Sequence, residues 1–196
     1  PEMRPVEQHL IPASAAERSL QILREFGADV WLFTTDKWLI DNPSGRYVAH
    51  EQHTIRSNPT IVTDFSPSLA SACKIVGASA DAARLEACEK AMQEALGSEA
   101  TAVRSQTYYL DITPPGFDKG TFVQAMAKHL DISTDAVATI GDMQNDLAMF
   151  RTSEGGMSRM AVSWDSPGAG GEMGLLGAEA IIAARPDVLV APQATG

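Results

Sequence analysis

The spacing of apolar residues predicts two amphipathic helices in the first half of the chain. Residues 14–27 repeat apolar side chains at intervals of three and four and end in a glycine, which is typical of a helix that stops there. Ser14 and Glu17 match a capping box at the start of this segment. Residues 81–97 show the same spacing, and four residues form their apolar face: Leu85, Cys88, Met92 and Leu96.

Short apolar runs around these helices predict strands. The runs lie at residues 29–41, 47–51, 60–65, 73–79, 100–105 and 107–112. The sequence NPSG at residues 42–45 is typical of a hairpin turn. Strands joined by hairpins and mixed with helices indicate an α+β domain with an antiparallel sheet over residues 1–112.

The pattern changes after TPPG at residues 113–116. A helical segment at 119–130 is followed by an apolar strand at 136–140 and a second helical segment at 143–150, with a further strand expected at 160–163. This alternation is typical of a parallel α/β sheet, whose buried strands are short continuous apolar runs. Residues 113–196 are therefore predicted to form a second, α/β domain.

Composition narrows the class of protein. The chain has 196 residues, of which 44% are hydrophobic and 20% charged, as in an ordinary globular protein. The net charge of −10 without a Lys/Arg cluster argues against a nucleic-acid partner. No apolar run approaches the roughly 18 to 20 residues that span a bilayer, and no signal peptide is visible. Cys73 and Cys88 are expected to be reduced thiols, so we expect a cytoplasmic protein.

The segment GDMQND concentrates polar groups where a buried strand becomes a helix. Asp142 and Asp146 are carboxylates that suit a hard cation such as magnesium, and Asn145 is an amide able to orient a phosphoryl oxygen. Ligands in open α/β sheets sit beyond the carboxyl ends of strands, which is where this segment falls. The alternative is that Asp142 only caps the helix and Asp146 is an exposed first-turn acid.

Lys119 is a second candidate. It opens the helix after the domain boundary, where the helix dipole disfavours a cation, and a residue set against a local preference can mark a functional position. The alternative is an ordinary surface lysine.

Together, DKG and GDMQND resemble the haloacid dehalogenase (HAD) superfamily, specifically its Cof-type branch. The resemblance implies a HAD-like Rossmannoid core with a parallel sheet, of which residues 113–196 are the C-terminal part. It implies a large α+β cap at residues 1–112. It also implies hydrolysis of a small phosphate monoester, of sugar phosphate or nucleotide type, through an aspartyl-phosphate with Mg²⁺.

The same resemblance implies catalytic roles for four residues. Asp142 and Asp146 are expected to bind the metal. Lys119 and Asn145 are expected to contact the substrate, with Lys119 neutralising charge on the nucleophile and the phosphoryl oxygens. The expected partner is a small phosphorylated metabolite.

The chain departs from the family pattern in two places. The family nucleophile lies in a DxD motif upstream of the cap, and no DxD occurs in these 196 residues. The N-terminal part of the core domain is therefore expected to be missing. Without this nucleophile, the 196-residue chain is expected to be inactive. Asp36, Asp41 and Asp64 fall within the predicted cap and are rejected as substitutes. The tail after residue 151 also lacks the usual family loop.

Two other functions remain open. A phosphomutase similar to phosphomannomutase would need cap residues for a second phosphate, for which Arg46, Arg56 and Arg104 are candidates unless they are surface charges. A non-catalytic binding protein would explain the missing nucleophile. In the cap, three aromatic residues either stack on a sugar or base or simply pack the sheet: Trp31, Trp38 and Tyr47.

Overall fold

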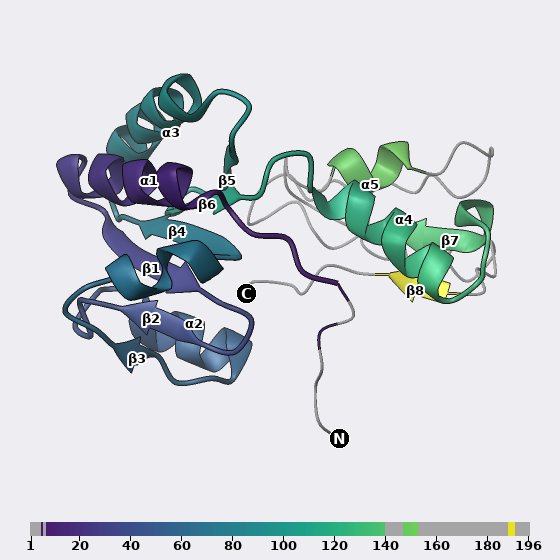
Figure 1. Cartoon of the computed structure of the whole chain (residues 1–196), viewed down its shortest axis with the longest axis horizontal. Helices are drawn as coiled ribbons and strands as arrows, with labels where there is room; N and C mark the ends of the chain where they lie inside the picture. The colour runs from purple at the N-terminus through teal and green to yellow at the C-terminus, as the bar shows by residue number, and fades with distance from the viewer. Residues whose placement is uncertain (1–4, 6, 140–146, 153–187, 191–196) are drawn as a thin grey trace, which may run out of the picture. The chain divides into compact units, whose positions relative to one another are not determined.

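The chain is divided into two compact units, the first covering Pro1–Gly116 and the second beginning at Phe117 (Figure 1). The computed structural model describes residue 5 and residues 7–139, 147–152 and 188–190. The sequence pattern places the domain boundary near residue 113. None of the helices in the described part of the chain is both long and apolar enough to cross a membrane.

The first unit contains a six-stranded sheet in the order β3-β2-β1-β4-β6-β5. The strands are β1 (Asp29–Phe33), β2 (Trp38–Ile40), β3 (Thr60–Ile61), β4 (Lys74–Ala78), β5 (Thr101–Gln106) and β6 (Tyr109–Thr113). All neighbouring pairs are antiparallel except β2 and β3, which run parallel. The predicted antiparallel sheet is therefore confirmed.

Helices α1 (Ala13–Glu25) and α3 (Ala82–Leu96) pack side by side on one face of this sheet (Figure 1). The apolar face predicted for α3 is fully buried in the core between the helices and the sheet. At Gly77 on β4, an added Cβ would collide with the Leu23 side chain, so the missing side chain lets α1 lie close to the sheet. The capping box expected at Ser14 is wrong, because the helix starts earlier, with Pro12 as its N-cap.

The opposite face carries α2 (Val48–Ile55) where a strand is expected from YVAHE. Val48 packs into an aromatic cluster on the sheet, and Ile55, two helical turns later, packs against the same cluster. The helix forms because this apolar face of the sheet must be covered, a tertiary requirement that a five-residue apolar run cannot reveal. Residues 42–45 accordingly turn into α2 and do not join two strands. A 3₁₀ helix, η1 (Ser66–Ser71), precedes β4.

The second unit has the predicted α/β pattern. It contains α4 (Lys119–His129), η2 (Thr134–Ala136), β7 (Val137–Thr139), α5 (Leu147–Arg151) and β8 (Val188–Val190). Strands β7 and β8 are parallel. A small core joins α4, β7 and α5 through Val123, Ala127, Val137 and Met149. The strand expected at residues 160–163 lies outside the described residues.

Candidate active site

The polar segment GDMQND connects β7 to α5. Asp142, Asn145 and Asp146 lie outside the described residues, so their predicted roles stay predictions. On the strand side, Thr139 is only 3% exposed and is the last residue of β7. Its buried hydroxyl has no hydrogen-bond partner in the described part of the chain. A buried polar atom in this state is a candidate for contact with a group that completes the site.

Lys119 is the first residue of α4, as predicted. The Asp118 side chain caps the helix by accepting a hydrogen bond from the Thr121 N–H at 2.9 Å, and the Asp118 N–H donates to Thr121 Oγ1 at 2.9 Å. The negative charge of the Asp118 carboxylate interacts favourably with the positive, N-terminal end of the helix dipole. The positive charge of Lys119 is unfavourable at the same end. This capping box was not predicted, because its usual sequence signal has Glu or Gln three residues after the cap, where this chain has Thr121.

The start of α4 packs against α5 at Gly120. A Cβ built on Gly120 would lie 2.5 Å from the carbonyl oxygen of Ala148 and 2.8 Å from its carbonyl carbon. Only a glycine permits this approach, since backbone atoms cannot rotate out of the way. Lys119 therefore neighbours a close contact with the helix that begins immediately after Asp146 in the sequence. Of the four predicted site residues, Lys119 is the one whose position the structure describes.

A divalent metal fits the chemistry of this segment, because Asp142 and Asp146 offer the hard oxygen ligands that Mg²⁺ prefers. Among the described residues, no group of three or more His, Cys, Asp or Glu side chains is arranged to hold a metal ion. The candidate metal ligands thus remain the two carboxylates of GDMQND.

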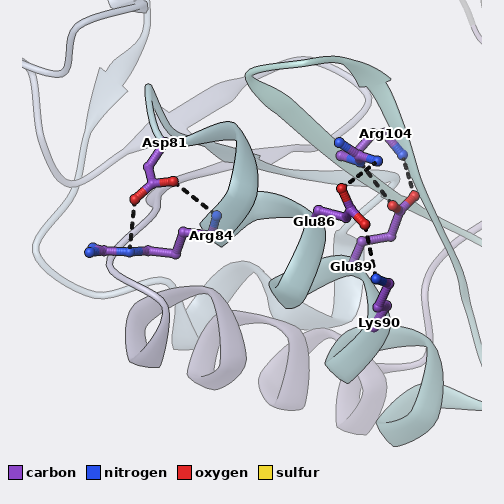
Figure 2. Close-up of polar contacts among 6 residues, drawn as sticks. All are labelled: Asp81, Arg84, Glu86, Glu89, Lys90 and Arg104. Carbon is purple, nitrogen blue, oxygen red and sulfur yellow. Dashed lines mark hydrogen bonds and ion pairs between the residues drawn. The ribbon is translucent and has the colours of Figure 1, made fainter.

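Arg104, a candidate anchor for a second phosphate, is already paired with carboxylates (Figure 2). Its Nε donates to Glu89 Oε2 at 2.9 Å, and its guanidinium lies 3.8 Å from Glu86 Oε2. Glu86 also pairs with Lys90 at 2.9 Å, which lowers the pKa of the Glu86 carboxyl. A guanidinium compensated by two acids is poorly suited to bind a phosphate dianion.

The two other candidate arginines belong to the region of α2. Arg46 is exposed, with its guanidinium 5.8 Å from the centre of the Tyr47 ring. Arg56 is exposed and ends α2 in the left-handed conformation, with φ of 52°. Neither arrangement itself indicates a phosphate site.

The tryptophans of the first unit pack the sheet. Trp31 and Trp38 are 1% and 3% exposed, and their rings meet edge to face with centroids 5.3 Å apart. Tyr47 stacks on Tyr108 at 4.6 Å, and both rings are half-buried. These contacts support the packing interpretation for the two tryptophans, since buried rings cannot stack on a ligand without rearrangement.

A polar group lies beside this aromatic cluster. Lys74 Nζ and Asp111 Oδ2 form an ion pair of 2.8 Å on neighbouring strands. Burial raises the pKa of the Glu51 carboxyl on α2, and the positive charge of Lys74 offsets part of that rise. Burial also raises the pKa of the Tyr109 phenol. Glu51 Oε2 and Asp111 Oδ1 have no hydrogen-bond partner in the described structure, so α2 covers an incompletely satisfied polar patch.

Asp36, Asp41 and Asp64 have local roles in the first unit. Asp36 accepts a hydrogen bond from Thr34, Asp41 pairs with Arg24 at 3.2 Å, and Asp64 accepts from Ser66. The hydrogen bonds from Ser66 lower the pKa of the Asp64 carboxyl. These contacts give no reason to restore any of the three as a nucleophile.

The sequence profile of haloacid dehalogenase-like hydrolases matches residues 1–158. The chain therefore belongs to the haloacid dehalogenase-like hydrolase family, as the motifs predict.

Solved structures share the fold. A haloacid dehalogenase-like hydrolase from Bacteroides thetaiotaomicron has a TM-score of 0.67 and 19% identity, with 93% of this chain and 63% of that protein covered. A Thermotoga maritima protein has a TM-score of 0.63 and 16% identity, covering 97% and 66%. The HAD subclass IIB sugar phosphatase BT4131 has a TM-score of 0.66 and 14% identity, covering 96% and 66%.

Two curated proteins match shorter parts of the chain. The chloroplastic endoribonuclease YBEY of Arabidopsis thaliana is 38% identical over 65 residues, which are 33% of this chain and 11% of that protein. A glucosylglycerol-phosphate synthase of Pseudomonas anguilliseptica is 40% identical over 57 residues, 29% of this chain and 7% of that protein. The chain thus spans only a small fraction of these curated relatives.

Proposed function

We propose that the protein is a magnesium-dependent phosphatase that hydrolyses a small phosphate monoester of sugar phosphate or nucleotide type. The observation that carries this proposal is the close contact of Gly120 with Ala148. It brings the helix that starts with Lys119 against the helix that follows GDMQND. We propose that the amine of Lys119 and the two carboxylates of GDMQND act together, since a cation and a metal-binding acid pair are components of phosphoryl-transfer sites.

In this proposal Lys119 neutralises negative charge on the phosphoryl oxygens, and Asn145 orients the same group by hydrogen bonding. Asp142 and Asp146 hold Mg²⁺. When bound, the ion supplies positive charge that offsets the charge of the transferring phosphoryl group.

The attacking group is an aspartate of a DxD motif, which these 196 residues do not contain. Its carboxylate oxygen forms a bond to phosphorus while the ester P–O bond breaks, and the leaving alkoxide takes up a proton from water. Water then hydrolyses the aspartyl-phosphate to inorganic phosphate and restores the carboxylate.

The first unit is proposed to act as the cap that selects the substrate. A sugar phosphatase of subclass IIB among the structures with this fold supports a small phosphorylated substrate. The pairing of Arg104 with Glu86 and Glu89 weakens the alternative of a phosphomutase, which needs a second phosphate anchor. The free thiols of Cys73 and Cys88 support a proposed location in the reducing cytoplasm.

The test is phosphate release from a broad panel of phosphate monoesters by a chain extended upstream of Pro1 so that it supplies a DxD motif. We expect turnover with Mg²⁺ and none after chelation with EDTA. Asp142→Ala is expected to lower kcat more than 100-fold, on the scale of lost transition-state charge stabilisation. Asp135→Ala removes an exposed carboxylate of the same unit and serves as the matched control.

Two results would count against the proposal. Full turnover by Asp142→Ala would show that the metal assignment is wrong. No turnover by the wild-type protein on any monoester would refute the phosphatase proposal and favour a non-catalytic binding protein.

A further inference from the structure

Backbone contacts hold the start of α4 on both sides of Lys119. Asp118 precedes it and Thr121 follows it, and the two residues form the reciprocal capping box, in which the backbone N–H of each donates to the side chain of the other. After Lys119, Gly120 is buried against α5, with its hypothetical Cβ 2.5 Å from the Ala148 carbonyl oxygen and 3.2 Å from the Ala148 Cβ. The capping box fixes the Lys119 backbone within the first turn of α4, and the Gly120 contact fixes that turn against α5.

The Gly120 contact cannot be relieved by a change of side-chain rotamer. Cβ atoms in proteins essentially never approach other heavy atoms below 3.0 Å, and the atoms met here are the carbonyl of Ala148. An alanine at position 120 must therefore push α4 away from α5. The helix would otherwise gain from the substitution, because alanine is favoured over glycine in a helix by about 1 kcal/mol. Gly120 therefore occupies a position where helix propensity alone would favour alanine.

We infer that Gly120, together with the Asp118–Thr121 capping box, is a positioning device for the amine of Lys119 in the phosphoryl-transfer site. The inference rests on the proposed function and adds residues to its site. Lys119 neutralises charge only if its amine lies within contact distance of the phosphoryl oxygens. A misplacement of about 1 Å can cost roughly 100-fold in rate.

The test compares single and double variants of the whole protein. Gly120→Ala is expected to lower kcat about 10- to 100-fold with a smaller change in KM, since positioning of a charge acts mainly in the transition state. Lys119→Ala is expected to lower kcat at least as much. The double variant Lys119→Ala/Gly120→Ala should be no slower than Lys119→Ala alone, because Gly120 acts through the lysine.

Val123→Ala is the matched control. Val123 is 2% exposed and packs in the same core, so its truncation destabilises this core by leaving a cavity and does not force the helices apart. It should lower the melting temperature while kcat stays within about twofold. Binding of inorganic phosphate, measured by calorimetry, supplies a readout apart from turnover and should weaken in Gly120→Ala by less than kcat falls, and should not change in Val123→Ala.

The outcomes separate the inference from the proposed function. Independent, multiplicative losses in the double variant, or a Gly120→Ala enzyme with normal kcat and phosphate binding, would overturn the positioning role while leaving the phosphatase intact. No turnover by the wild type overturns both. If Gly120→Ala does not fold, Thr121→Ala removes the cap hydroxyl on the same helix start and must show a smaller kcat loss that also vanishes in the Lys119→Ala background.

Discussion

Glu89 is expected to be the most important acidic residue for the stability of the first unit. It lies on α3, and its Oε1 accepts from the backbone N–H of Arg104 while its Oε2 accepts from the Arg104 Nε, both at 2.9 Å (Figure 2). Arg104 is on β5, the edge strand beside β6 in the described sheet, and its backbone N–H donates to Glu89 and not to β6. Glu89 therefore joins a helix to an open sheet edge.

The expected cost of Glu89→Ala is about 2 to 3 kcal/mol. A hydrogen bond to a charged group contributes about 1.5 to 3 kcal/mol. The Glu89 side chain is 16% exposed and the Arg104 side chain 30%, so solvent screening reduces the sum of two such bonds. Glu89→Gln keeps one acceptor oxygen for the backbone N–H but places its NH2 group opposite the Arg104 guanidinium, so the charge and one hydrogen bond are lost. It should cost about 1 to 2 kcal/mol, less than Glu89→Ala.

Urea unfolding followed by tryptophan fluorescence measures these costs, since Trp31 and Trp38 are buried in the same unit. The midpoint should shift without a change in the slope m. Lys90→Ala, which removes the exposed partner of Glu86, is the control and should unfold like the wild type. Equal midpoints for Glu89→Ala and Lys90→Ala would refute the proposed bridging role.

Three further predictions concern the first unit. Because burial raises the pKa of Glu51, its contribution to stability is present below the ordinary carboxyl pKa and is lost as pH rises through the raised value. Glu51→Gln should therefore flatten the fall in unfolding free energy above pH 4.5, measured by urea titration at several pH values, and an unchanged pH profile would contradict this. Gly77→Ala should cost about 1 to 3 kcal/mol by overpacking against Leu23, and a wild-type urea midpoint would contradict the contact. Burial raises the pKa of the Cys88 thiol to about 11, which leaves little reactive thiolate at neutral pH. Iodoacetamide should therefore label the partly exposed Cys73 first, as followed by mass spectrometry. Equal labelling of both residues would show that Cys88 is accessible.

The amino-acid sequence by itself determined the long helices and the family. Periods of three and four identify α1 and α3 because each helix buries one continuous stripe, and that stripe can be read without knowing its partner. The motifs DKG and GDMQND predict the haloacid dehalogenase-like family, which the match over residues 1–158 confirms. The helices follow from local apolar spacing, and the family follows from the resemblance of the two motifs.

Tertiary structure decided the features that depend on distant partners. Helix α2 exists because an aromatic sheet face needs covering, and its eight residues are too short to show a clear period. Arg104 looks like a phosphate anchor until Glu86 and Glu89 are found beside it. Gly120 looks like an ordinary weak helix residue until the carbonyl of Ala148 is found where its side chain would lie. Sequence spacing encodes neighbours along one element, whereas packing between elements is set only when the chain has folded.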